Sequence, residues 1–135
     1  MRLLLDANLL ISLCDLDHVD HQRATIWSQQ NMKLFATCAI TQGALIRHIM
    51  RAKEGATVLQ AKGILKQVVS MPGHIFWSDA VSYMDLPEKG VVGYRQVTDA
   101  YLIALAAHHT GRVATFDRAL AALHSPIAIL VGYTG

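Results

Sequence analysis

The stretch that decides the fold is MRLLLDANLL, residues 1–10, in which a run of leucines stops at Asp6 and resumes after Asn8. Such a run predicts a buried strand, Arg2–Leu5, with a carboxylate directly at its carboxyl end. Burying a carboxylate costs free energy unless it is paired, hydrogen-bonded or bound to a cation. Asp6 therefore needs a partner.

Short apolar runs alternate with segments of helical period along the rest of the chain. The further predicted strands are Lys33–Thr37, His74–Trp77, Arg112–Phe116 and Ile127–Val131. The predicted helices are Asp20–Gln30, Ile40–Met50, Ala56–Ser70 and Thr98–His109, with Thr41 and Thr98 expected to cap helix starts. The pattern indicates an α/β fold, a three-layer α/β/α sandwich around a mainly parallel five-stranded sheet.

Length and composition indicate a single domain over residues 1–135 with a substantial core. With 53% hydrophobic and only 16% charged residues, the chain has more apolar surface than a small monomer usually hides, which favours an interface with a partner or, as a homodimer, with a second copy of the chain. Cys14 and Cys38 are isolated, and no signal peptide or membrane-length apolar stretch stands out. A reducing cytoplasm is the expected location.

Three acids fall where a parallel sheet builds its binding site, beyond the carboxyl ends of the strands. Asp6 and Asp117 each follow a predicted strand, and Asp99 opens a predicted helix. Singly, Asp99 is explained as a first-turn helix acid and Asp117 as the cap of a short helix, RALAAL. Together, three close carboxylates favour a hard divalent cation such as Mg²⁺ or Mn²⁺ and phosphodiester hydrolysis.

Three longer segments carry a family resemblance: LLLDANLLISL (residues 3–13), ATCAITQGALIRHIM (36–50) and VTDAYLIALAAHHTGRVATFD (97–117). They resemble the PIN domain, specifically the VapC toxins of bacterial toxin–antitoxin pairs, and DLDHVDHQRATIW (15–27) resembles a segment of a subset of those toxins. The resemblance implies a dimeric Mg²⁺- or Mn²⁺-dependent endoribonuclease. It also implies a cognate VapB-type antitoxin, whose C-terminal segment crosses the active-site groove.

The resemblance assigns roles to individual residues. Asp6, Asp99 and Asp117 match the family's metal-binding acids. The family usually places Glu where this chain has Gln42, and an amide supplies an oxygen but no negative charge. We therefore expect Gln42 to orient a water or ligand, with metal binding weakened by about 1–2 kcal/mol.

Three more positions match polar or basic residues of the family. Asn8 matches a hydrogen-bonding residue behind the acids, Thr115 lies near the same pocket, and Arg47 is expected to meet phosphate or the antitoxin. The segment from Arg47 to Lys66 holds five basic residues against Glu54 alone, with apolar residues between them. This combination suits a groove for an antitoxin peptide, although a solvated basic face has the same pattern.

Other polar residues have simpler interpretations. His18 with His21, and the pair His108 and His109, lack a third ligand at zinc spacing. The acids Asp15, Asp17 and Asp20 are read as helix caps, whereas Asp79, which follows the strand HIFW, is explained equally well by a place at the same sheet edge or by a helix cap.

Two alternative functions stay open. One is a PIN-like RNA-binding module whose catalysis Gln42 has weakened, and the other is a receiver-like or phosphatase-like α/β domain. Single-stranded loops of any RNA class fit a basic groove, and no aromatic platform for a base stands out in the sequence.

Overall fold

The computed structural model describes residues 1–132, and its centre is a sheet of five parallel strands in the order β3-β2-β1-β4-β5. The strands are β1 (Leu3–Leu5), β2 (Phe35–Cys38), β3 (His74–Trp77), β4 (Arg112–Thr115) and β5 (Ala128–Leu130). In the central strand, Leu3 is in register with Phe35 on one side and with Arg112 on the other. All five predicted strands are confirmed, and every pairing is parallel.

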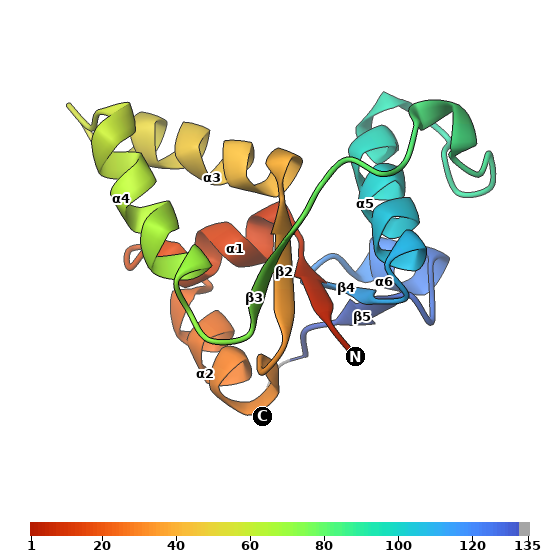
Figure 1. Cartoon of the computed structure of the whole chain (residues 1–135), viewed down its shortest axis with the longest axis horizontal. Coiled ribbons are helices and arrows are strands. Elements are labelled where there is room, and N and C mark those ends of the chain that lie inside the picture. The colour runs from red at the N-terminus through yellow and green to blue at the C-terminus, as the bar shows by residue number, and fades with distance from the viewer. Residues whose placement is uncertain (133–135) are drawn as a thin grey trace.

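Helices cover both faces of the sheet, so the predicted three layers are confirmed (Figure 1). The helices are α1 (Ala7–Cys14), α2 (His21–Asn31), α3 (Ala39–Ala52), α4 (Val58–Val69), α5 (Val97–His108) and α6 (Arg118–Leu123). Two 3-10 turns, η1 (Tyr83–Asp85) and η2 (Tyr94–Gln96), lie between β3 and α5. Helices α1 to α4 lie on one side of the sheet, and α5 and α6 on the other. Within residues 1–132, no helix combines the length and apolarity needed to cross a membrane.

The central strand feeds two separate cores because successive side chains of a strand point to opposite faces. Leu4 packs into the cluster that holds Leu105 of α5, whereas Leu5 packs with Phe35 and with Leu45 of α3. All five of these side chains are fully buried. This two-sided burial explains why the strand reads as an unbroken apolar run that ends only at Asp6.

The sequence patterns do not predict α1, which begins at Ala7 directly after Asp6. Its sequence, ANLLISLC, is apolar on almost every side, and Leu9, Leu10 and Ser12 are buried against neighbouring elements. A helix enclosed in this way lacks the polar stripe by which an amphipathic helix is recognised. As a result, Asp6 stands at the junction of a strand and a helix.

Two predicted helix caps are wrong in position. Helix α3 begins at Ala39, and Thr41 lies inside its first turn, where its hydroxyl accepts a hydrogen bond from the Cys38 N–H at 3.1 Å. Thr98 likewise lies inside α5, because the 3-10 turn η2 leads directly into that helix at Val97. In both cases the threonine follows the true start of the helix by one to two residues.

Candidate active site

Asp6 is held by the backbone on both sides of the strand–helix junction. Its N–H donates to the Ala114 carbonyl at 3.1 Å, continuing the pairing of β1 with β4. Its carboxylate accepts the Leu9 N–H at 2.8 Å and so caps the start of α1. With only 5% of its surface exposed, the carboxylate is fixed in place and largely removed from water.

Thr115, the last residue of β4, joins two of the predicted acids. Its buried hydroxyl donates to the Asp6 carboxylate and accepts the backbone N–H of Asp117 at 2.9 Å. Asp117 in turn caps α6, accepting the Leu120 N–H at 3.0 Å. The capping interpretation of Asp117 is therefore confirmed, and the same geometry brings Asp117 beside Asp6.

Asp99 completes the group from the first turn of α5. Burial raises the pKa of the Asp6 carboxyl to about 6, even though hydrogen bonds from Thr115 and Leu9 oppose the change, and the charges of Asp99 and Asp117 raise it further. Burial and the charge of Asp117 also raise the pKa of Asp99. The three carboxylates thus lie close enough to repel one another.

A hard divalent cation fits the chemistry of this group. The side chains offer carboxylate oxygens, which Mg²⁺ and Mn²⁺ prefer, and their mutual repulsion is the kind that a bound cation relieves. Across residues 1–132, however, no three His, Cys, Asp or Glu side chains stand ready in the geometry of a metal site. The acids therefore suit a cation by charge and donor type, without a preformed three-ligand geometry.

A pocket of about 200 Å³ opens beside the acids and has walls of both charge signs. Asp99 and Asp117 line it together with Arg95 and His124, and the charge of His124 acts to lower the pKa of Asp99. Acidic groups attract a cation, whereas Arg and His attract phosphate. A cation and a phosphate group can thus be held side by side at this edge of the sheet.

Gln42 has a different set of contacts from the three acids. It lies in α3, and its amide donates to the Thr37 hydroxyl at 3.0 Å, while that hydroxyl lies 2.8 Å from Nε2 of His74. Within residues 1–132, no hydrogen bond connects Gln42 to the acids. Instead it lines a groove of about 520 Å³ between α3 and α4, together with Lys62 and Lys66. A role for Gln42 in orienting water or ligand stays a prediction.

The other predicted polar residues lie on α1 and α3. Asn8 is exposed in the first turn of α1, and its backbone carbonyl accepts the Ser12 hydroxyl at 2.7 Å. Arg47 is exposed on α3, and its guanidinium lies over Gly43, where an added Cβ would stand 3.3 Å from Nη1. Arg47 therefore extends back toward the start of α3.

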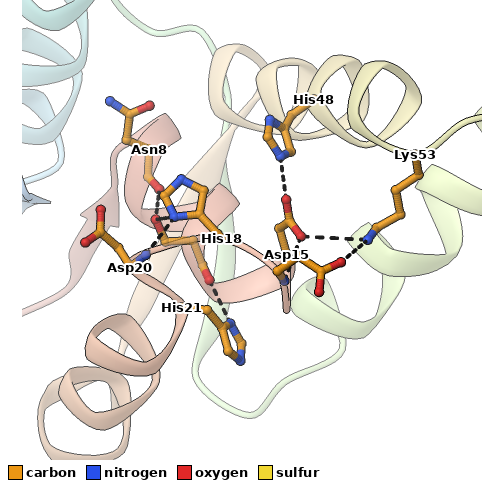
Figure 2. Close-up of polar contacts among 9 residues, drawn as sticks. Asn8, Asp15, His18, Asp20, His21, His48 and Lys53 are labelled. Atoms are coloured by element: carbon orange, nitrogen blue, oxygen red, sulfur yellow. Dashed lines mark hydrogen bonds and ion pairs between the residues drawn. The ribbon is translucent and has the colours of Figure 1, made fainter.

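Asp15 has a role that the sequence did not reveal (Figure 2). It is at the C-terminal end of α1, and its carboxylate lies 2.8 Å from Nε2 of His48 on α3 and 3.7 Å from Nζ of Lys53. The hydrogen bond with His48 is the largest cause that lowers the pKa of Asp15. The capping interpretation of Asp15 is wrong, because the carboxylate connects α1 to α3. The sequence separation of 33 between Asp15 and His48 hid this pair from spacing arguments.

The neighbouring histidines contact the backbone in the same view (Figure 2). Nδ1 of His18 accepts the Asp20 N–H at 3.0 Å, and Nδ1 of His21 lies 2.8 Å from the Ser12 carbonyl. Asp20 occupies the cap position of α2, but its carboxylate pairs with Arg23 at 3.0 Å instead of capping. These contacts fix the connection between α1 and α2.

Of the two interpretations of Asp79, the helix cap is wrong. No helix begins there, because the chain after β3 runs irregularly to Ser82, whose hydroxyl caps η1. The Asp79 carboxylate accepts the Tyr101 hydroxyl at 3.0 Å. Burial together with this hydrogen bond raises the pKa of Tyr101 to about 12. Asp79 therefore connects the segment after β3 to α5.

Comparisons with known proteins identify the family to which this chain is similar. The family model of the PIN domain matches residues 3–124. Ribonuclease VapC29 of Mycobacterium tuberculosis is 44% identical over 134 residues, which is 99% of each chain. Ribonuclease VapC44 of the same organism is 42% identical over 127 residues, covering 90% of this chain and 89% of the relative. Ribonuclease VapC38 is 36% identical over 118 residues, or 84% of each chain.

Proposed function

The chain belongs to the PIN-domain family, among the VapC-type ribonucleases, and on that premise we propose that it is a Mg²⁺- or Mn²⁺-dependent endoribonuclease and the toxin of a toxin–antitoxin pair. The observation that carries the proposal is the Thr115 hydroxyl, which fixes Asp6 beside Asp117 while Asp99 adds its charge. Three carboxylates that repel one another at the carboxyl edge of a parallel sheet are suited to binding a divalent cation.

In phosphodiester cleavage, some side chains would bind the cation and others would bind the phosphate. Asp6, Asp99 and Asp117 would hold the cation, with Thr115 fixing the first and last of these in position. When bound, a divalent cation lowers the pKa of a water molecule and stabilises the charge that develops on the phosphate oxygens. Arg95 and His124, on the wall of the same pocket, place the scissile phosphate against the acids.

The proposed protein partners are an antitoxin of VapB type and a second copy of this chain. The groove between α3 and α4 combines apolar residues with basic ones, since Leu59 and Leu65 line it together with Lys62 and Lys66. Leu59 is 76% exposed, as expected of an anchor point that another chain covers. We place the protein in the cytoplasm, where its two free cysteines stay reduced.

The alternative function, RNA binding with weakened catalysis, rests on Gln42. Its amide is engaged by Thr37, so the pocket gains neither a charge nor a base from that position. If this alternative holds, the protein binds RNA and Mn²⁺ but cleaves only after Gln42→Glu. The nuclease proposal expects cleavage by the natural chain, strengthened in Gln42→Glu.

The test is cleavage of total RNA by the purified, antitoxin-free protein over a titration of Mg²⁺ and Mn²⁺. Discrete cuts that require metal are expected, and Asp6→Asn and Asp117→Asn should abolish them. Asp17→Asn is the matched control, because it makes the same chemical change at a side chain that is 90% exposed and pairs with Lys53, at the end of α3, instead of with the acids. Metal-independent cuts, or full activity in Asp6→Asn, would refute the proposal.

A further inference from the structure

Tyr94 is an exposed aromatic side chain next to the acid pocket. Its exposed fraction is 81%, the highest of any Phe, Tyr or Trp side chain among residues 1–132. The residue that follows it, Arg95, lines the pocket that Asp99 and Asp117 share. A large apolar ring left in water beside a reaction site costs hydration free energy that a stacking ligand would recover.

Hydrogen bonds hold the segment that carries Tyr94 in one conformation. Oε1 of Gln96 accepts the N–H of Val92 at 2.7 Å and that of Gly93 at 2.9 Å. At the start of the segment, Gly90 has φ of +86° and packs so closely that an added Cβ would stand 2.9 Å from Leu123 of α6. Tyr94 is therefore presented on a segment that is fixed at both ends, so that little ordering is left for a ligand to induce.

Arg95 connects the exposed ring to the acids. Its guanidinium carbon lies 5.7 Å from the centre of the Tyr94 ring, and its Nε donates to the Tyr94 hydroxyl at 3.3 Å. A planar cation beside an aromatic ring is a surface on which nucleobases stack, while the same cation attracts the phosphate of the nucleotide. Tyr94 would then bind the base of a nucleotide, and the next residue, Arg95, would bind its phosphate.

We propose that Tyr94 and Arg95 form a nucleobase-stacking site that makes the acid pocket select single-stranded RNA. This inference rests on the proposed nuclease function and adds a substrate preference to it. In a duplex both faces of each base are already stacked, so only an unpaired base can use the ring. The mixed charges of the adjoining pocket, with Arg95 and His124 beside the acids, favour a nucleotide over an apolar protein segment as the ligand.

The experiment measures binding without cleavage, by fluorescence anisotropy in Ca²⁺ or without metal. The probe is a labelled 12-nucleotide RNA, used as a single strand and annealed to its complement. Tyr94→Ala should weaken single-strand binding by about tenfold, the usual effect of one stacked base, and leave duplex binding unchanged. Tyr94→Phe and Tyr94→Trp keep a ring and should keep the affinity. Val92→Ala is the matched control, since this side chain is 90% exposed on the same segment.

A second readout is the fluorescence of Tyr94→Trp, which single-stranded RNA should quench; Trp27 and Trp77 are 7% and 5% exposed and give a constant background. The proposal fails if Tyr94→Ala binds the single strand as the natural protein does. It also fails if binding of strand and duplex falls equally, or if Tyr94→Ala loses only binding to a purified antitoxin. Selective loss of single-strand binding in a protein that never cleaves would keep the stacking site and refute the nuclease. RNA cleavage by Tyr94→Ala with an unchanged KM would keep the nuclease and refute the stacking site.

Discussion

The folded chain stabilises the ionised form of the Asp6 carboxyl group only in part. Its pKa is raised to about 6 by burial, against 3.8 for an ordinary Asp, although two hydrogen bonds support the carboxylate. As pH rises from 4 to above 6, the unfolded chain loses this proton before the folded chain does, and the stability of the metal-free protein falls. The cost is greatest at neutral pH, where a divalent cation would offset it.

Asp6→Asn should therefore stabilise the metal-free protein at neutral pH. We expect a gain in the free energy of unfolding of about 2 kcal/mol at pH 7.5, shrinking to near zero below pH 4 as the natural carboxyl becomes protonated. Urea unfolding in EDTA at several pH values measures the difference. Asp17→Asn should show no such pH-dependent gain, and a destabilised Asp6→Asn at pH 7.5 would contradict the assignment.

Thr115→Val tests the hydroxyl between Asp6 and Asp117. Valine keeps the shape but removes the donor to Asp6 and the acceptor for the Asp117 N–H, both of which are buried or partly buried. We expect a loss of about 2 kcal/mol in stability and a strong loss of RNA cleavage. Thr115→Ser keeps the hydroxyl and should retain most of both. Equal activity of the valine and serine variants would show that the hydroxyl is not needed.

Among the elements, the turn between α4 and β3 depends on one glycine. Gly73 has φ of +88°, and an added Cβ would stand 1.9 Å from the Lys33 carbonyl oxygen. Gly73→Ala should destabilise the protein by more than about 2 kcal/mol, since both the backbone conformation and the close approach oppose a side chain.

Gly63→Ala is the matched control for this substitution. Gly63 lies inside α4, and a Cβ there meets nothing within 4 Å. Alanine should stabilise this helix by up to about 1 kcal/mol. Thermal unfolding of the two variants therefore gives shifts of opposite sign; a stable Gly73→Ala protein would contradict the structure of the turn.

The contact between α1 and α3 through Asp15 and His48 should depend on pH in the opposite way to Asp6. Because the pKa of Asp15 is lowered in the folded protein, its contribution is present above about pH 4 and is lost on acidification below that value. Asp15→Asn should cost about 1 kcal/mol at pH 7 and less below pH 4. Urea unfolding of this variant and of Asp17→Asn at both pH values checks the prediction. A loss that grows on acidification would contradict it.

Sequence alone predicted the strands, which stand out as short apolar runs, and missed the enclosed helix α1. All five strands were predictable because each is an apolar run, whereas α1 is enclosed and has no polar face. Asp6, Asp99 and Asp117 could be grouped because the carboxyl ends of parallel strands share an edge. The pair Asp15 and His48 joins distant segments by side chains alone, and Tyr94 is distinguished only by its exposure. No spacing rule reveals either.

For the whole molecule, the fold separates the two surfaces to which we assign different ligands. The acid pocket lies beside α5 and α6, whereas the groove with Lys62 and Lys66 lies between α3 and α4, on the other side of the sheet (Figure 1). One small domain can therefore bind RNA at the acid pocket and an antitoxin segment at the groove between α3 and α4. Inhibition then requires that the antitoxin chain extend from its anchor toward the acids.

The central claim is that Asp6, Asp99 and Asp117 hold one divalent cation, and Mn²⁺ binding to the antitoxin-free protein tests it most directly. Titration calorimetry at pH 7.5 should detect binding by the natural protein and by Asp17→Asn. Each of Asp6→Asn, Asp99→Asn and Asp117→Asn should weaken the affinity at least about tenfold, since each removes a charged oxygen ligand. Mn²⁺ affinity unchanged in all three variants, or no binding by the natural protein, would contradict the account.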